Sequence, residues 1–264
     1  MNKYIKSILD KELKDYEPPK ETTTVNNSVY SNNIVVANPP FNLKKWGQEK
    51  LKEDKRWVYG VPPKGNANFA WIQHMIYNVS DTGRIGLVLA NGSLSSTTSG
   101  EGKIREKILE DDLVECIIAL PTQLFSNTSI PVCLWLLNKD KKQEGKVLFI
   151  DAREMGEMIS RKERILTEED IKQLTETYTR FEEGLLEDEK GFCKTSTSEE
   201  IKKHDYILTP GRYVGFKPEE DDGIPFEEKM KTLTSELDDL FKESDRLEIQ
   251  IRNNLKAIGF PIGK

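Results

Sequence analysis

The sequence of 264 residues is poor in the residue types that build disulfide frameworks and metal sites. It contains 3 cysteines and 2 histidines, and Cys116, Cys133 and Cys193 are far apart. This odd, scattered set argues against a disulfide framework and against a four-ligand zinc site. We therefore expect no metal, and a reducing, cytoplasmic compartment.

Long hydrophobic runs are also missing. The longest apolar run, 130–137, is far shorter than the roughly 18 residues that a membrane span requires. The first residues lack an apolar core and carry several lysines, which is unlike a signal peptide. We expect no membrane partner.

Charge is unevenly distributed along the chain. Residues 1–150 hold 20 Lys and Arg against 17 Asp and Glu, a net charge of +3, whereas residues 151–264 hold 19 against 28, a net charge of -9. This charge balance does not indicate a general nucleic-acid binder, because nonspecific affinity requires an excess of Lys and Arg that neutralises the phosphates. If the protein binds DNA, we expect its first half to face it.

The hydrophobic pattern of residues 1–150 predicts an α/β fold. Apolar spacings of three and four predict a helix over 66–79, and a charged helix follows at 101–110. Strands that alternate with helices imply a parallel or mixed sheet with helices on both faces. The last strands follow one another without a helix, so we expect an antiparallel edge. The predicted strands are 34–37, 84–90, 113–120, 131–137 and 146–150.

The remaining chain divides into two regions. Residues 151–224 read as a helical connecting region, in which Thr167 caps a helix and 208–214 form a turn with a short extended piece. The region 225–264 is predicted to contain one long helix, over about 225–258, with a heptad repeat that is typical of a coiled coil and calls for a facing helix. We favour a partner chain as its source over packing within this chain. The repeat consists of Phe226, Met230, Leu233, Leu237, Leu240, Leu247, Ile251 and Ile258.

Asn38-Pro39-Pro40-Phe41, directly after an apolar strand, is the most informative motif. The two prolines fix φ near -65° and remove two backbone donors, so the turn presents carbonyl oxygens. Asn38 adds an amide oxygen at the carboxyl end of a strand, where open α/β sheets bind ligands. Two such acceptors suit a planar amino group, and Phe41 provides a ring for a base to stack on. The constellation fits methyl transfer to an exocyclic amine. The alternative is a rigid strand exit with Phe41 in the core.

Several segments, in this order, resemble the modification (M) subunit of type I restriction-modification systems, which is an N6-adenine DNA methyltransferase. The resemblance runs from about residue 30 to the end of the chain. The matching segments are 34–42, 68–71, 83–89, 100–105, 120–125 and 210–213.

The resemblance implies a Rossmann-like methyltransferase sheet, with S-adenosyl-L-methionine as the cofactor. It implies that Asn38 and Pro39 hold an adenine flipped out of double-stranded DNA, with Pro40 in the same turn and Phe41 stacking on the base. Phe125 matches a second aromatic of the base pocket, although a core position is an equal alternative. It also implies a specificity subunit docked on the carboxyl-terminal helix, with a second modification subunit and the restriction subunit as further partners.

The sequence departs from the family in its cofactor-binding region. The family has a glycine-rich turn and an acidic residue upstream of the Asn-Pro-Pro motif, whereas the 37 residues before Asn38 contain no glycine. Gly100 and Gly102 lie after a later strand and do not replace that turn. We therefore expect a carboxyl-terminal part of the subunit that lacks its cofactor-binding front half, with no appreciable activity of its own.

A basic, aromatic segment follows the motif. It is either a solvated loop or a contact to phosphates beside the flipped base. Its members are Lys44, Lys45, Trp46, Lys50, Lys52, Lys55, Arg56, Trp57, Tyr59 and Lys64.

Three functions remain open from the sequence. The first is a modification subunit, and the second is a catalytically dead assembly or interaction remnant. The third is a protein glutamine N-methyltransferase, which also uses an Asn-Pro-Pro-aromatic turn; the acidic helical tail argues against it.

Overall fold

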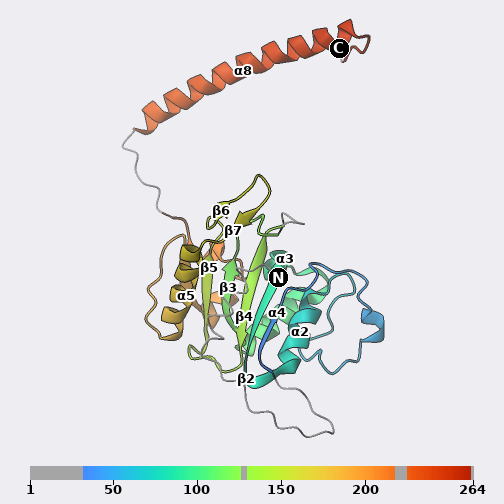
Figure 1. Ribbon diagram of the computed structural model, residues 1–264, viewed down its shortest axis with the longest axis vertical. Helices are drawn as coiled ribbons and strands as arrows, with labels where there is room; N and C mark the ends of the chain where they lie inside the picture. Colours follow the sequence, from blue (N-terminus) through green and yellow to red (C-terminus); the bar gives the residue numbers. More distant parts are fainter. Residues whose placement is uncertain (1–31, 126–129, 218–224, 263–264) are drawn as a thin grey trace. The chain divides into compact units, whose positions relative to one another are not determined.

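The computed structural model describes residues 32–125, 130–217 and 225–262 (Figure 1). The chain divides into two compact units, Met1–Lys217 and Pro218–Lys264. In the described residues, no helix is long and apolar enough to cross a membrane.

A six-stranded mixed sheet forms the centre of the first unit, in the order β1-β2-β4-β3-β5-β8. Strands β1 and β2 are parallel, as are β3 and β5, while β4 and β8 run against their neighbours. The strands are β1 (Asn32–Ala37), β2 (Val79–Ala90), β3 (Val114–Ala119), β4 (Val132–Asn138), β5 (Lys146–Asp151) and β8 (Cys193–Thr197).

The sheet differs from the prediction in two respects. Antiparallel strand β4 lies in the interior between β2 and β3, and not only at an edge. The antiparallel edge strand is β8, from a stretch that we predicted to be helical connection. Residues 151–217 therefore belong to the same compact unit as the other strands.

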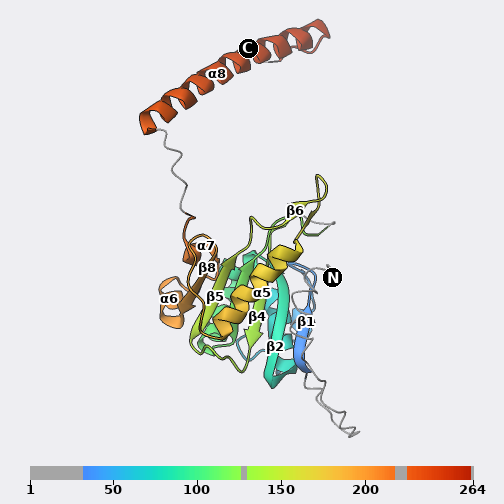
Figure 2. The same cartoon turned by 60° about the vertical axis from the view of Figure 1, so that its left-hand side comes forward.

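Helices cover both faces of the sheet, as expected. One face packs against α2 (Asn68–Asn78) and α4 (Glu101–Glu110), where Phe69 meets the fully buried Trp135 edge to face with ring centroids 6.4 Å apart. The other face packs against α5 (Glu168–Glu182), which buries Leu174 and Phe181 (Figure 2). Because both faces are covered, the central strands are almost continuously apolar.

Helix α5 begins at the predicted cap. The Thr167 side chain accepts a hydrogen bond from the Asp170 backbone, and the Asp170 carboxylate accepts one from the Thr167 N–H. This capping box satisfies donors that would otherwise lack partners at the helix start.

Short elements complete the first unit. The predicted extended piece at 208–214 is instead the helical turn α7 (Gly211–Val214), which stacks Tyr213 on Phe149 of β5 with centroids 3.8 Å apart. The other short elements are η1 (Gln48–Lys50), α3 (Gly92–Ser95), η2 (Thr98–Gly100), β6 (Glu157–Met158), β7 (Arg164–Ile165) and α6 (Ser198–Lys203).

The described part of the second unit contains one long helix, α8 (Phe226–Ala257), where the heptad repeat predicts it. Its apolar residues are exposed; Leu237 and Leu240, for example, are 48% and 66% exposed. The Arg252 guanidinium donates a hydrogen bond to the Ile262 carbonyl at 2.8 Å, which holds the following residues against the last turns of the helix.

Candidate base-binding site

The Asn-Pro-Pro-Phe turn lies at the carboxyl edge of the sheet. Strands β1, β2, β3 and β5 run in one direction, so their carboxyl ends meet at that edge, where open α/β sheets bind ligands. Asn38 and Pro40 are exposed and Pro39 is buried. The Asn38 side chain makes no hydrogen bond to any residue that the structure describes. Its amide therefore remains available to a ligand.

Two aromatic rings meet beside this turn. Phe41 follows β1, and Phe125 follows β3, so they come from distant parts of the sequence. Their ring centroids are 5.7 Å apart at an interplanar angle of 78°, an edge-to-face contact. Both rings are half-buried against the core on the α5 face, and neither lies fully inside it. The fold thus brings together Phe41 and Phe125, the two aromatic residues predicted for this site.

A pair of carboxamides, which we did not predict, fixes the exit of the turn. Asn42 has a left-handed φ of 51°. Its N–H donates to Asn68 Oδ1 at 3.2 Å, and Asn68 Nδ2 donates to Asn42 Oδ1 at 3.0 Å. Asn68 opens α2 and is 1% exposed. The available sequence signal was the residue type, since asparagine tolerates left-handed backbone better than most residues.

The basic segment after the motif is an ordered loop. Trp46 and Trp57 pack edge to face at 5.9 Å, and their ring N–H groups donate to backbone carbonyls. Asp54 is paired with Arg56, which holds the pKa of that carboxyl below its usual range. Lys64 is paired with Glu49. Among the described residues, no ion pair involves Lys44, Lys45, Lys50 or Lys52, all of which are exposed.

The other reactive side chains that the structure describes do not form a second centre. Among the described residues, no three of His, Cys, Asp and Glu lie close enough together to hold a metal. His74 Nδ1 lies 2.7 Å from the Arg56 guanidinium, and burial lowers the pKa of this histidine. Burial raises the pKa of Cys116 and Cys133, which disfavours their reactive thiolate forms.

The described residues do not by themselves fit a site for S-adenosyl-L-methionine. Strand β1 is the first strand in the sheet order, so Asn38 stands at the outer end of the carboxyl edge. Gly100, at φ 90°, precedes α4, and Gly102 lies within α4, where an added Cβ would be 3.2 Å from the Thr97 methyl. Their roles are in the helix start and its packing.

A family model described as N-6 DNA methylase matches residues 1–222. The chain belongs to the N-6 DNA methylase family. The predicted resemblance to type I modification subunits is confirmed by two relatives. Over 229 residues, the chain is 54% identical to the type I restriction enzyme HindI methylase subunit of Haemophilus influenzae, covering 86% of this chain and 52% of the relative. Over 237 residues, it is 48% identical to the MjaIX methylase subunit of Methanocaldococcus jannaschii, covering 86% and 42%.

Solved structures of methylase subunits have the same mixed α/β fold. The type I methyltransferase subunit from Streptococcus thermophilus aligns with a TM-score of 0.65 and 29% identity, over 75% of this chain and 40% of that chain. The M protein of the EcoKI enzyme aligns with a TM-score of 0.52 over 81% and 50%, and at 19% identity it supports the fold alone. This member of the family spans about half the length of the curated relatives that it matches.

Proposed function

We propose that this chain is the part of a type I modification subunit that holds the target base. The whole enzyme transfers a methyl group from S-adenosyl-L-methionine to N6 of an adenine flipped out of DNA. One observation carries the proposal: Asn38, its side chain unpaired among the described residues, stands at the carboxyl end of β1 beside the Phe41–Phe125 pair. This arrangement combines a hydrogen-bond acceptor with a stacking surface, which together suit an amino-substituted base.

In this proposal, the Asn38 Oδ1 and Pro39 carbonyl oxygens accept the two N–H bonds of the adenine amino group. Both acceptors draw the hydrogens to one side, so the nitrogen lone pair is directed away from them. Phe41 and Phe125 supply the apolar wall on which the base packs, a type of contact worth about 1–3 kcal/mol per stacked base. These residues bind and orient the amine, so their contribution is positioning.

S-adenosyl-L-methionine supplies the methyl group when bound. We propose that its binding elements belong to the part of the relatives that this chain does not match, since the described residues do not form such a site. The six-stranded sheet would then be the carboxyl-terminal part of a Rossmann-like methyltransferase sheet. The chain alone is accordingly expected to bind the cofactor weakly and to have no appreciable activity.

The long helix is proposed to dock subunits. Along α8 the heptad positions Met230, Leu237 and Leu247 are 42–48% exposed, so its apolar stripe is not covered within its own unit. Such a stripe fits a facing helix in a coiled-coil-like contact. We propose a specificity subunit as that partner, in a cytoplasmic complex that a second modification subunit and a restriction subunit can join.

Reconstitution separates this function from its two alternatives. This chain is combined with a specificity subunit and with the part of the Haemophilus influenzae relative that it does not match, and labelled methyl transfer is followed. The proposal predicts N6-methyladenine in DNA. Label in glutamine of a protein would support the glutamine methyltransferase, and no transfer by an assembled complex would support a catalytically dead remnant.

A further inference from the structure

A β-hairpin with a basic tip extends from the carboxyl edge of the sheet. Strands β6 and β7 pair Glu157 with Ile165 and Met158 with Arg164. The hairpin begins at Gly156, whose φ is 83° and whose added Cβ would lie 2.5 Å from the Ile165 carbonyl oxygen. Only glycine fits this close approach. The hairpin is therefore built into the fold at a defined place, beyond the end of β5 (Figure 1).

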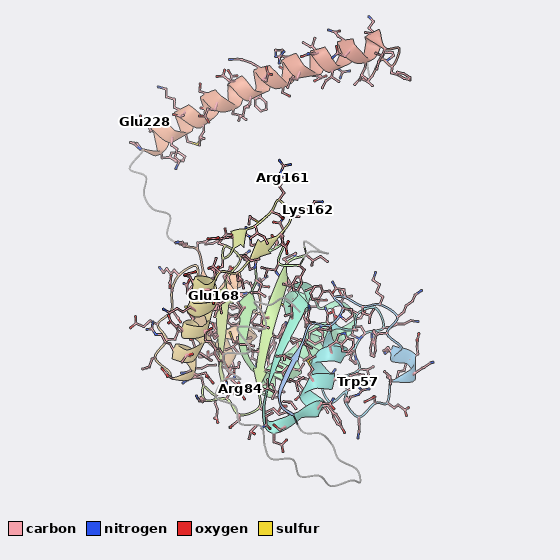
Figure 3. All side chains as sticks on the ribbon, viewed as in Figure 1. Trp57, Arg84, Arg161, Lys162, Glu168 and Glu228 are labelled. Atoms are coloured by element: carbon pink, nitrogen blue, oxygen red, sulfur yellow. The ribbon has the colours of Figure 1, made fainter. Side chains whose placement is uncertain are left out.

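Two adjacent cations occupy the tip. Arg161 and Lys162 are exposed, and Figure 3 shows both side chains directed away from the sheet. Within the described ranges neither side chain forms an ion pair. These two positive charges lie in a strongly acidic part of the chain, since residues 151–264 carry a net charge of -9. Of the nearby acids, Glu163 directly follows Lys162 and is exposed, whereas Glu157 lies at the base of the hairpin, where it lines a depression with Asp151 and Asp170.

The hairpin is tied to the loop that carries Phe125. The Arg164 backbone N–H donates to the Gln123 carbonyl at 2.9 Å, and Gln123 Nε2 donates to the Arg161 carbonyl at 3.2 Å. Gln123 has a left-handed φ of 65° and precedes Phe125 by two positions. One residue therefore bonds to strand β7 and to the tip of the hairpin, and leads into the candidate base pocket.

We infer that hairpin β6–β7 contacts the DNA backbone, with Arg161 and Lys162 on phosphates close to the flipped base. The inference rests on the proposed function, because it places the duplex at the carboxyl edge of the sheet. Long exposed cationic side chains make charge-assisted contacts to phosphates, and these contacts set the position of a protein on DNA. Phosphate contacts do not read the base sequence. Gln123 is a positioning residue in this arrangement, because it links the phosphate contact to the loop that holds Phe125.

The test is a double charge reversal, R161E/K162E, in the reconstituted complex that also contains the specificity subunit. DNA affinity is measured over a series of salt concentrations. Each phosphate contact contributes roughly 0.9 to the steepness of log K against log salt, so without these two contacts the slope should become shallower by about 1.8. DNA affinity at low salt should fall about tenfold. The matched control is K202E/K203E. That exposed lysine pair lies on α6, which follows Thr197 at the opposite edge of the sheet, so its reversal leaves the slope unchanged.

A second variant tests the link to the base pocket. Gln123→Gly retains the left-handed backbone and the carbonyl, and it removes only the side-chain hydrogen bond to Arg161. With 2-aminopurine at the target position, the fluorescence rise that reports base flipping should fall about threefold, as expected for one hydrogen bond. The salt slope should remain that of the wild type.

The outcomes are distinguishable. If the wild-type complex methylates adenine and R161E/K162E binds DNA like the control pair, the hairpin inference is wrong and the proposed function stands. If the reversal instead releases the specificity subunit on gel filtration, the hairpin contacts protein and the DNA assignment is overturned. If the wild-type complex neither binds nor methylates DNA, the proposed function fails, and the hairpin inference fails with it.

Discussion

The carboxamide pair of Asn42 and Asn68 gives the sharpest quantitative prediction. Asn68→Ala removes two hydrogen bonds, to the Asn42 backbone and side chain. Each is worth about 1 kcal/mol, so the free energy of unfolding should fall by about 2 kcal/mol. For a unit of this size the melting temperature should fall by about 4–8 °C. Asn42→Gly keeps the left-handed backbone without strain. It loses the side-chain bond from Asn68 and an exposed one from Asn66 Nδ2 at 3.3 Å, so it should cost about 1 kcal/mol.

A double-mutant cycle in urea tests this reasoning. Asn68→Ala already removes both bonds between the two residues, so adding Asn42→Gly should cost only the exposed bond from Asn66. The two effects should therefore be non-additive by about 1 kcal/mol. In the reconstituted complex, Asn68→Ala should also lower methyl transfer, whereas Asn42→Gly should retain more of it. Asn78→Ala, at the other end of α2, removes a bond to the His74 carbonyl and serves as the destabilised control with normal transfer. Strictly additive costs, or equal transfer in all three single variants, would refute the positioning role.

Three further predictions concern the core, the long helix and the basic loop. Glu115 is 1% exposed, and burial raises its pKa. Its contribution to the stability of the wild type is therefore full below the unfolded-state pKa and is lost as the pH rises through the folded-state pKa. The melting temperature of Glu115→Gln minus that of the wild type should consequently increase from pH 4.5 upward. A difference that stays constant with pH would contradict this. Replacing Leu237 and Leu240 with Asp should abolish co-purification with a specificity subunit, and retention of the partner would rule out the exposed stripe as the dock. Charge reversal at Lys44 and Lys45 should make the slope of log K against log salt shallower, by about 0.9 for each phosphate that is no longer neutralised. An unchanged slope would indicate a solvated loop.

Local sequence patterns predicted most of the regular elements. Helix α4 has the predicted bounds, Glu101–Glu110, because its apolar spacing is regular and Gly100 precedes it. Strand β5 was predicted to within one residue, since both faces are buried and its residues are apolar. The Asn38 turn was found because proline and asparagine have specific backbone and hydrogen-bonding properties that can be reasoned from residue type alone.

The elements that were missed depend on contacts between distant segments. Strand β8 contains Lys194, Thr195 and Ser196, and it becomes a strand because it pairs with β5 at the sheet edge. The position of β4 between β2 and β3 is likewise set by pairing, which the hydrophobic pattern of one strand does not encode. The same limit applies to Gln123, whose partners lie in a hairpin of two-residue strands too short to give a pattern.

The central claim is that Asn38 holds the amino group of the target base. Its most direct test is the single-turnover rate of methyl transfer by the reconstituted complex carrying Asn38→Ala, with cofactor and DNA affinities measured in parallel. Loss of a group that positions the reacting atom should slow transfer about 100-fold, with both affinities close to those of the wild type. Transfer at the wild-type rate by Asn38→Ala would contradict the account.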